Sequence, residues 1–504
     1  MLSSLNRLTS HIQSNDHRLS KTLLTIRSLS TLKRHPNPNL YTTINSLYGN
    51  PNRSVVPKLD QWVETGRKVQ VSDLQRIIRN LRRRGRYSQA LQVSEWMENQ
   101  GICSLPSDHA VRLDLIGHVH GVESAETYFN SMRDPDRTVK AYGALLNCYV
   151  RAGSTIKSLS LVQKMKDMGF LLSHLVYNDL MCLYTKISEH EKVPRLLAEM
   201  KANNVSPNNF SYRICLNSYG VRSDIESMER LLEQMENDSD ISMDWTTYSV
   251  VANHYIKAGL PDKAKVALEK SEQLLSKADG PGYAHLITLH SSLQNKGCML
   301  RLWHLKKTAL NRHTNMDYAV MLGSLLKLGE FEEAETLMEM YESSGNNYDF
   351  RVPNVLLLGY SQNGEAEKAE AMLRGLVEKG RVAIPSSWSI VAAGYARKNE
   401  MTKAVECMKR ALTISVDEHC DWSPALDAIA SMLHWLGDEG TIDEVEAFVE
   451  LLKSRIPMNR DMYYALINAN VKVGREVDDL VERMKVDKID VDEKIENERA
   501  NLYR

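Results

Sequence analysis

Cysteine, proline and glycine are sparse in this sequence. None of its seven cysteines forms a CxxC pair, and 14 prolines and 25 glycines in 504 residues leave little room for disordered stretches. An odd number of scattered cysteines argues against a disulfide framework and a zinc knuckle, and it favours a reducing compartment. We therefore expect Cys148, Cys182 and Cys215, which fall in apolar stretches, to pack as small hydrophobic residues.

An excess of one charge and long apolar runs are missing as well. Lys plus Arg number 63 against 64 for Asp plus Glu, so any surface that binds nucleic acid must be local. No run of about 18 apolar residues occurs, which predicts that the chain has no membrane span. A chain of 504 residues is too long for one compact core, so several domains or a repeat array are expected.

Motifs of the common enzyme classes are absent too. The sequence has no GxxxxGK[ST] or GxGxxG loop to hold phosphates and no GxSxG turn to present a nucleophile. The C-terminal aspartates, such as Asp478 and Asp487, are interspersed with lysines and lack the spacing of metal ligands. The sequence therefore predicts a protein that is not an enzyme, with no cofactor, no metal site and no small-molecule substrate.

The first forty residues have the composition of an organellar targeting segment. They contain one acid, Asp16, against six Lys and Arg and eleven Ser and Thr. This pattern predicts a transit peptide at residues 1–29, for the mitochondrion first and the plastid second. A disordered basic tail is the alternative. Residues 30–70 are expected to be a linker and an N-terminal capping segment.

An internal repeat of 35 residues determines the expected fold. Residues that keep this step, with the same type or a close substitute, are Tyr142, Tyr177 and Tyr212; Met165, Met200 and Met235; Gly329, Gly364 and Asn399; and Ala334, Ala369 and Ala404. Within a unit the tyrosine precedes the glycine by 11 residues, as from Tyr142 to Gly153, which is about three helical turns. Such a period indicates a repeat architecture.

Each mark of the repeat has a physical reason. Glycine, or asparagine at position 399, can adopt the left-handed conformation that ends a helix. The alanine five residues later allows two antiparallel helices to approach closely. Apolar residues recur at three and four between the marks, which predicts two amphipathic helices per unit. Since each pair exposes an apolar side, stacking of the pairs into a superhelix is expected.

These residues resemble the pentatricopeptide repeat proteins of plant organelles, whose repeats look like VTYNxLIxxYxKxGxxxxAxxLxxxMxxxGxxPD. The similar stretches run from Val139 to Met165, from Leu175 to Asn208, and from Trp245 to Ala264. The resemblance implies the P subfamily and an all-α fold, a right-handed superhelical solenoid of helix-turn-helix repeats about 35 residues long. The array would cover residues 71–490 in about 11 to 12 units, followed by a charged tail at 491–504.

The family pattern sets the unit boundaries. Well-matched units lie at 139–173, 174–208, 209–244, 245–279, 280–314, 315–349, 350–384 and 385 to about 420. Looser copies lie at 71–106, 107–138, about 421–459, and 460 to about 490.

Proteins of this family bind single-stranded RNA at one base per repeat. The resemblance implies that the fifth and the last residue of each unit read the base. The corresponding pairs are Gly143 with Ser173, Asn178 with Asn208, Arg213 with Asp244, Ser249 with Asp279, Ala284 with Thr314, Ala319 with Asp349, and Asn354 with Ile384. Only Asn178 with Asn208, which favours a pyrimidine, and Ser249 with Asp279, a guanine type, fit the family preference well. Alanine and isoleucine cannot bond a base edge.

Basic residues give a second indication of nucleic acid. An arginine cluster contains Arg79, Arg82, Arg83 and Arg86, whose guanidinium groups could contact phosphates. The alternative, a solvated helix face, is at least as well supported, because an apolar stripe of leucine and isoleucine lies opposite the arginines. Around Trp303, we expect the ring to pack in the core and most of the neighbouring charges to face solvent.

Two functions remain open at this point. One is binding of single-stranded organellar RNA in processing, stability, splicing or translation. The other is a scaffold subunit of a large ribonucleoprotein such as the mitochondrial ribosome, with ribosomal or RNA-processing proteins as partners.

Overall fold

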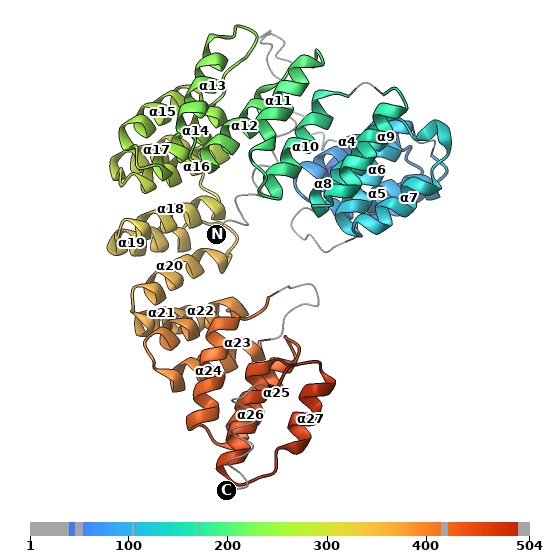
Figure 1. The fold of residues 1–504 in the computed structure, drawn as a ribbon. Helices are drawn as coiled ribbons and strands as arrows, with labels where there is room; N and C mark the ends of the chain where they lie inside the picture. The colour runs from blue at the N-terminus through green and yellow to red at the C-terminus, as the bar shows by residue number, and fades with distance from the viewer. Residues whose placement is uncertain (1–39, 46–53, 103–104, 171, 415–421, 492–504) are drawn as a thin grey trace. The chain divides into compact units, whose positions relative to one another are not determined.

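The computed structural model describes residues 40–45, 54–102, 105–170, 172–414 and 422–491. Every regular element within these ranges is a helix, which confirms the predicted all-α repeat fold (Figure 1). The chain forms two compact units, Met1–Ser271 and Glu272–Arg504. The predicted transit peptide at 1–29 lies outside the described residues, and so does all of the predicted tail except residue 491.

The first compact unit is built from helix pairs, with two short helices ahead of them. These are α2 (Leu40–Asn45) and α3 (Val56–Glu64), which pack on α4 and α5 respectively. The first helices of the pairs are α4 (Val71–Arg83), α6 (Pro106–Val119), α8 (Val139–Ala152), α10 (His174–Lys186), α12 (Asn209–Val221) and α14 (Trp245–Lys257). The second helices are α5 (Tyr87–Asn99), α7 (Val122–Ser131), α9 (Thr155–Asp167), α11 (Lys192–Ala202), α13 (Ile225–Asn237) and α15 (Pro261–Leu274), of which the last crosses the boundary at Ser271. A short 3-10 turn, η2 (Asp134–Asp136), follows α7.

The second compact unit repeats the same plan. Its first helices are α16 (Gly280–Ser292), α18 (Asn315–Lys327), α20 (Arg351–Gln362), α22 (Pro385–Arg397), α24 (Leu426–Glu439) and α26 (Arg460–Lys472). Its second helices are α17 (Lys296–Leu310), α19 (Phe331–Glu342), α21 (Ala366–Glu378), α23 (Met401–Thr413), α25 (Ile442–Lys453) and α27 (Asp478–Val486).

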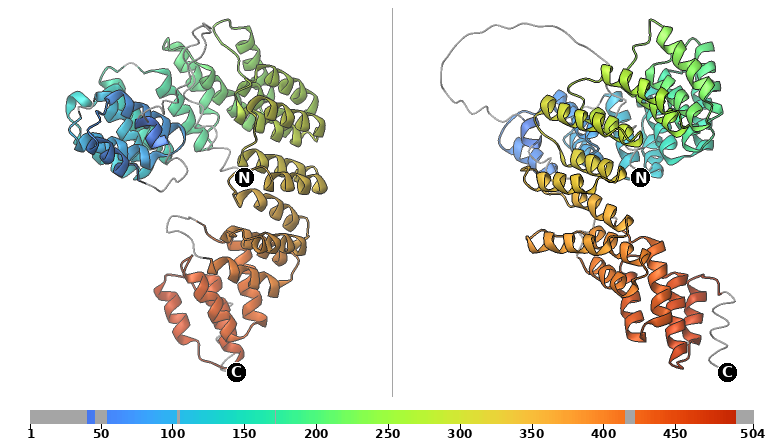
Figure 2. Two further views of the ribbon diagram at one scale, coloured as in Figure 1. Left: turned by 180° about the vertical axis from the view of Figure 1, so that it is seen from behind. Right: turned by 90° about the vertical axis from the view of Figure 1, so that its left-hand side faces the viewer.

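First helices of successive pairs pack directly on one another within each unit. In the first unit α8, α10, α12 and α14 form one such row, and in the second unit α16, α18, α20 and α22 form another. The two views of Figure 2 show the same succession of pairs from other sides. Equivalent residues of neighbouring repeats therefore lie in a line along each row.

The turns between paired helices have the left-handed backbone that the glycine marks predict. Gly153 has φ 71° and Asn399 has φ 61° at equivalent places. The units that lack glycine there place Ser188, Ser223 and Gln294 in the same conformation, with φ of 63°, 58° and 55°. A residue with a Cβ pays about 1 kcal/mol or more for this conformation, so the packing of the flanking helices imposes the turn.

The core contains the repeat marks. Tyr142, Tyr177 and Tyr212 are buried, and Met165, Met200 and Met235 are fully enclosed. Alanines at the start of the second helices, such as Ala264 and Ala334, are fully buried as well. This burial fits the expectation that a larger side chain would separate the paired helices.

The charges around Trp303 contain one exception to the expectation. Trp303 itself is buried and stacks on His313, as predicted for a core ring. Lys306, however, is buried as well, where its Nζ donates to Gly280 O at 2.8 Å and pairs with Asp317. A buried cation is tolerated here because it has both a carboxylate and a carbonyl partner.

Two further predictions can be compared with the described residues. Cys148 and Cys215 are buried in helices, as expected, while Cys182 is partly buried. Of the helices in the described ranges, none is both long enough and apolar enough for a membrane crossing.

Candidate nucleic-acid interface

The predicted reading residues lie at the beginnings of the first helices. The fifth residue of a unit falls in the first or second turn of its first helix, and the last residue is commonly the N-cap of the next first helix. Asn208 caps α12 by accepting from Ser211 N at 2.9 Å, and Asp244 caps α14 by accepting from Thr247 N at 2.8 Å. Helix capping alone therefore favours Asn, Asp, Ser and Thr at the last position.

Asn178 and Asn208 are brought together by the packing of α10 on α12. Asn178 Nδ2 donates to Asn208 Oδ1 at 3.4 Å, and Ser211 Oγ donates to Asn178 Oδ1 at 2.7 Å. Asn178 is only 2% exposed, whereas Asn208 is exposed. With its Oδ1 engaged at the cap, Asn208 has its Nδ2 amide group available to donate to a ligand.

The next pair, Arg213 and Asp244, is closed by an ion pair. Arg213 Nη1 lies 2.6 Å from Asp244 Oδ2, and the arginine also contacts the Thr246 hydroxyl. Burial raises the pKa of Asp244, but the Arg213 charge and the hydrogen bonds from Thr246 and Thr247 outweigh it, so the pKa lies below its usual value. A base that separated this ion pair would leave each charge without its partner, which costs free energy for partly buried groups.

The carboxylate of Asp349 also forms an ion pair with an arginine. Arg351 forms a two-pronged contact with it, with Nε 3.0 Å from Oδ1 and Nη2 2.6 Å from Oδ2. Its partner in the predicted pair, Ala319, offers no polar side-chain atom. The carboxylate therefore serves an ion pair in this structure.

Asn354 does not contact its predicted partner Ile384 through a hydrogen bond but contacts two serines of the next repeat. Ser387 Oγ donates to Asn354 Oδ1 at 2.7 Å, and Asn354 Nδ2 donates to Ser386 Oγ at 3.1 Å. The predicted partner Ile384 is the N-cap residue of α22 without a side-chain cap bond. Asn354 thus makes polar contacts at this unit, but with serines that the repeat pattern did not single out.

Three pairs remain, and two of them, Gly143 with Ser173 and Ser249 with Asp279, have a residue that can hydrogen-bond a base at one or both positions and no alanine. Gly143 is half-buried in α8, and Ser173 is exposed at the N-cap of α10. Ser249 is buried in α14 and its hydroxyl donates to Thr246 O at 2.9 Å. Asp279, in the second compact unit, caps α16 by accepting from Gly282 N at 3.1 Å.

The arginine cluster on α4 divides into exposed and engaged members. Arg79 and Arg83 are exposed, and Arg86 is half-buried. Arg82 pairs with Asp114 at 2.7 Å, and the same carboxylate binds Arg151 at 2.7 Å. Because Arg82 belongs to this bridge between α4, α6 and α8, Arg79 and Arg83 are better placed to contact phosphates.

Cations that the sequence reasoning missed lie in the last turns of first helices in both compact units. Lys186, Lys327 and Arg397 occupy this position, and Lys327 and Arg397 are 70 residues apart, which is two repeats. Lys327 Nζ donates to Ser292 Oγ at 2.8 Å, and Arg397 Nη1 donates to Ser361 O at 3.1 Å. These cations thus bind the end of the preceding first helix, where its dipole favours positive charge. The signal was present in the 35-residue step.

Exposed apolar side chains at the second position of two units were also missed. Leu175 is 57% exposed and Met316 is 67% exposed, each beside the N-cap of its first helix. Apolar surface next to polar reading groups can cover the flat face of a base. Burial alone distinguishes these residues from core residues, and burial is not visible in the sequence.

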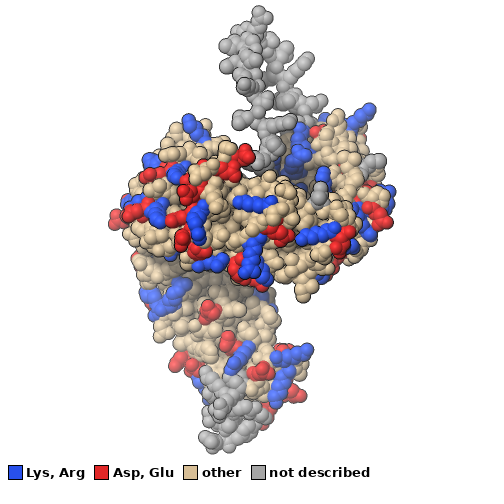
Figure 3. All heavy atoms as spheres, turned by 45° about the horizontal axis from the view of Figure 1, so that its top comes forward, with Lys and Arg blue, Asp and Glu red and all other residues tan. Residues whose placement is uncertain are grey.

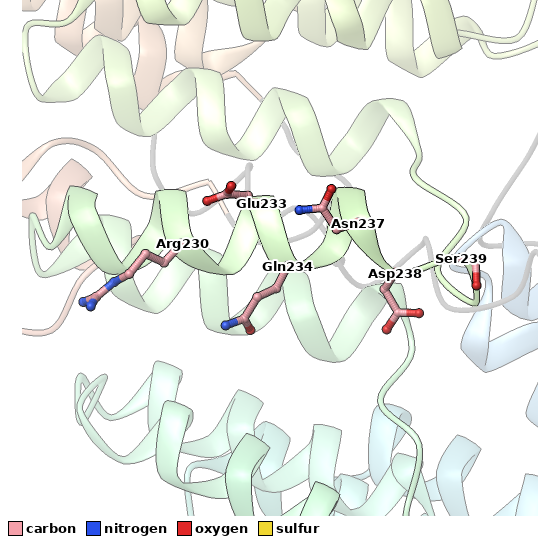
Figure 4. Close-up of a pocket in the computed structure, with 6 residues that line it drawn as sticks. All are labelled: Arg230, Glu233, Gln234, Asn237, Asp238 and Ser239. Carbon is pink, nitrogen blue, oxygen red and sulfur yellow. The ribbon is translucent and has the colours of Figure 1, made fainter.

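An open surface pocket beside α13 offers no converging chemistry. It has a volume of about 610 Å³ and is lined by α13 and the residues that follow it. Figure 4 shows Glu233 and Asn237 on one side of α13 and Arg230 and Gln234 on the other. On the face drawn in Figure 3, cations and anions are interspersed over the surface.

Sequence comparison identifies the repeats directly. The family model of the PPR repeat family matches residues 172–221, and that of the PPR repeat matches 140–170, 318–346, 352–381 and 386–413. A mitochondrial pentatricopeptide repeat-containing protein of Arabidopsis thaliana is 48% identical over 90% of this chain and 92% of its own length. The chain belongs to the pentatricopeptide repeat family.

Two other members of the family show its range. The large ribosomal subunit protein mL101 of Arabidopsis thaliana is 31% identical over 88% of this chain and 91% of its own length. A crystal structure of the pentatricopeptide repeat protein PPR10 with an 18-nt psaJ RNA element is 17% identical, with a TM-score of 0.36, and the match covers 92% of this chain and 77% of that one.

Proposed function

We propose that this protein binds single-stranded organellar RNA along the rows of first helices. The observation that carries the proposal is the Asn178–Asn208 contact, in which the amide of Asn178 in α10 meets the amide of Asn208 at the N-cap of α12, beside an exposed first-helix edge. Amide groups can hydrogen-bond a base edge. The adjacent exposed Leu175 can cover the face of the same base.

The RNA-binding role is a non-catalytic one, with no cofactor, no small-molecule substrate and no membrane partner. We infer the P subfamily, because the sequence has neither the HxE nor the CxxC element of the family's deaminase domains. The mitochondrion is the proposed location. The acid-poor N-terminus supports it, as do relatives named as mitochondrial proteins.

Crosslinking to organellar RNA tests the proposal. The purified protein should bind RNA with an affinity that falls as salt rises, because cations such as Arg79 and Arg83 would release counterions from phosphates. Asn178→Ala should alter base preference at one nucleotide. An RNA affinity that is independent of salt, together with an Asn178→Ala variant of unchanged preference, would contradict RNA reading by this face.

A scaffold role in the mitochondrial ribosome is the second candidate. It is favoured by two ion pairs at predicted reading residues, Arg213 with Asp244 and Arg351 with Asp349, which leave fewer groups for bases. A relative of this chain is named as a large ribosomal subunit protein. Sedimentation of an organellar lysate separates the two roles: comigration with a ribosomal subunit supports the scaffold, and a small free complex contradicts it.

A further inference from the structure

The first helix pair of the array carries a surface of one charge. Between residues 65 and 94 the sequence has eight Lys and Arg but one acid, Asp73, whereas the whole chain has 63 Lys and Arg and 64 Asp and Glu. Six of the eight cations are exposed, and we call them the basic face: Arg67, Lys68, Arg76, Arg79, Arg83 and Arg84. We propose that the basic face binds the phosphates of a double-helical RNA segment without reading its sequence.

The arginines of α4 lie on the side of the helix away from its partner α5. Arg76, Arg79 and Arg83 follow one another at intervals of three and four residues, so they share one side of the helix. The opposite side belongs to the core that α4 forms with α5, through the buried residues Leu74, Ile77, Ile78 and Leu81. With a rise of 1.5 Å per residue, the three arginines span about 10 Å of the helix axis. They therefore form a stripe of cations.

Carboxylates neutralise little of the basic face. Arg76 pairs with Asp73 at 2.9 Å, and Asp73 is the one acid of the stretch. Lys68, Arg79 and Arg83 have no carboxylate partner among the residues that the structure describes. Their charges are therefore available to an anionic ligand.

A second acid-poor stretch shows that composition alone does not leave cations unpaired. Residues 280–316 contain five Lys and Arg and no Asp or Glu. Three of these five nevertheless pair with acids outside the stretch: Lys296 with Glu333, Arg301 with Glu272, and Lys306 with Asp317. Folding thus neutralises most of that stretch, but it leaves the basic face charged.

The surroundings of the basic face decide which kind of partner fits it. Apart from its cations, every exposed residue from 65 to 88 is polar or glycine, so the face lacks the apolar centre of a protein interface. The nearby rings of Tyr41 and Trp62 are partly buried, and each has an arginine over it, at 5.0 Å and 4.6 Å. A surface that holds unpaired bases commonly offers free aromatic rings for stacking. The basic face offers phosphate-binding groups instead.

A double helix matches such a surface, because its bases are paired and its phosphates face outward. Guanidinium groups fit phosphate oxygens in pairs. The two strands of a DNA double helix together carry a charge about every 1.7 Å of axis, twice the density of one strand, so a duplex presents more phosphates to a 10 Å stripe. Duplex RNA is bound mainly through its shape and backbone. The choice of RNA over DNA rests on the proposed function.

The test measures binding of the purified full-length chain to an RNA duplex of about 16 base pairs, a length that other duplex-binding modules span. Fluorescence anisotropy is recorded over a range of salt, since each phosphate contact of a duplex contributes about 0.9 to the slope of log affinity against log salt. The double variant Arg79→Gln with Arg83→Gln should bind more weakly and reduce this slope by about 2. Both arginines are exposed and glutamine is a good helix former, so the variant should fold.

The matched control is the double variant Arg195→Gln with Arg230→Gln. It also removes two exposed arginines from helices, in α11 and α13, and changes the net charge by the same amount. Its affinity for the duplex and its salt slope should equal those of wild type. An equal loss in this control, or an unchanged slope in the Arg79 and Arg83 variant, would overturn the proposal.

Two further probes separate the possible ligands. If the Arg79 and Arg83 variant lost affinity for a DNA duplex or for single-stranded RNA, but kept its affinity for duplex RNA, the assigned ligand would be wrong. A chain that bound single-stranded RNA and no duplex would overturn the role of the basic face alone. A chain that bound RNA of neither kind would contradict the proposed function as well.

Discussion

Repeats 174–208 and 209–244 are neighbours with the same helix plan, but their reading pairs differ. In both repeats the fifth and the last residue meet through side-chain contacts, Asn178 with Asn208 and Arg213 with Asp244. The first contact joins two amides, and the second is an ion pair with a largely buried arginine. The stacking of first helices therefore brings both of these pairs together although their residues differ, and one side chain decides whether a group remains for a base.

The tyrosines of both repeats should contribute equally to stability, because the two repeats share one scaffold. Tyr177 and Tyr212 are both buried at the same position. Tyr177→Ala and Tyr212→Ala should each lower the free energy of unfolding by about 3 to 5 kcal/mol, as for other large aromatic cavities. Chemical denaturation measures this. Tyr177→Phe, which removes only the hydroxyl that accepts from Asn203 at 2.7 Å, should cost about 1 kcal/mol. A large difference between the two alanine variants would show that the scaffolds are not equivalent.

Carboxylates of the two repeats should give opposite pH dependence. Burial, with a further contribution from Asp114, raises the pKa of Asp179 to about 7. The folded protein then holds this proton more tightly than the unfolded chain, so its stabilising effect is present below about pH 3.8 and lost as pH rises through about 7. Asp179→Asn should raise the free energy of unfolding by about 4 kcal/mol at pH 8 and change it little at pH 4.

Asp244→Asn is the contrasting variant, because the pKa of Asp244 is lowered and its stabilisation is present above pH 3.8. It should destabilise the protein at pH 7 and have less effect as pH falls below 3.8. Asparagine keeps the helix cap, so capping is not at issue. Equal pH profiles for the two variants would contradict the assigned environments.

Arg213→Asn should open the closed repeat. The variant removes the ion pair and gives unit 209–244 an amide beside Asp244, which is exposed enough to accept a further hydrogen bond. We expect a new base preference of roughly tenfold, about 1.4 kcal/mol, at the nucleotide next to that read by Asn178. Selection from a randomised RNA library measures it. Arg213→Lys keeps the charge and should show no new preference, so a preference in that variant would contradict closure by the ion pair.

The helix caps should be the weakest difference between the repeats. Asn208→Ala and Asp244→Ala each remove a side chain that accepts from a backbone N–H at the start of a first helix. Each should cost about 1 kcal/mol in thermal or chemical unfolding. Asn204→Ala is a suitable control for general surface effects, because Asn204 is exposed, although its positive φ of 55° calls for comparison with Asn204→Gly. If neither cap variant changed the free energy of unfolding, helix capping would not explain the polar residues at the last position, and RNA binding would be their remaining role.

The repeat scaffold was accessible from the sequence because its marks are local and periodic. Gly153 and Asn399 are residue types that favour a left-handed turn, so they predicted the turns at which they lie. The buried tyrosines recur at a 35-residue step. The turns at Ser188 and Gln294 were not accessible, since neither residue prefers a left-handed backbone and packing imposes it.

The candidate site was only partly accessible from the sequence. The 35-residue register of the repeats predicted that Asn178 lies opposite Asn208. The partners of long side chains, however, depend on the three-dimensional packing of the helices. Arg351 occupies Asp349, and Arg82 occupies Asp114 in another repeat, through contacts that no spacing rule expresses. The contact between Ser211 and Asn178 also spans two repeats, so it emerges only when the helices are stacked.

The most direct test of this account is base selection by wild type, Asn178→Ala and Arg213→Ala in one RNA library. The account predicts that Asn178→Ala abolishes a pyrimidine preference at a single nucleotide, whereas Arg213→Ala leaves every preference shown by wild type in place. Loss of wild-type preferences in Arg213→Ala, or an intact pyrimidine preference in Asn178→Ala, would contradict the claim that one repeat reads and its neighbour is closed.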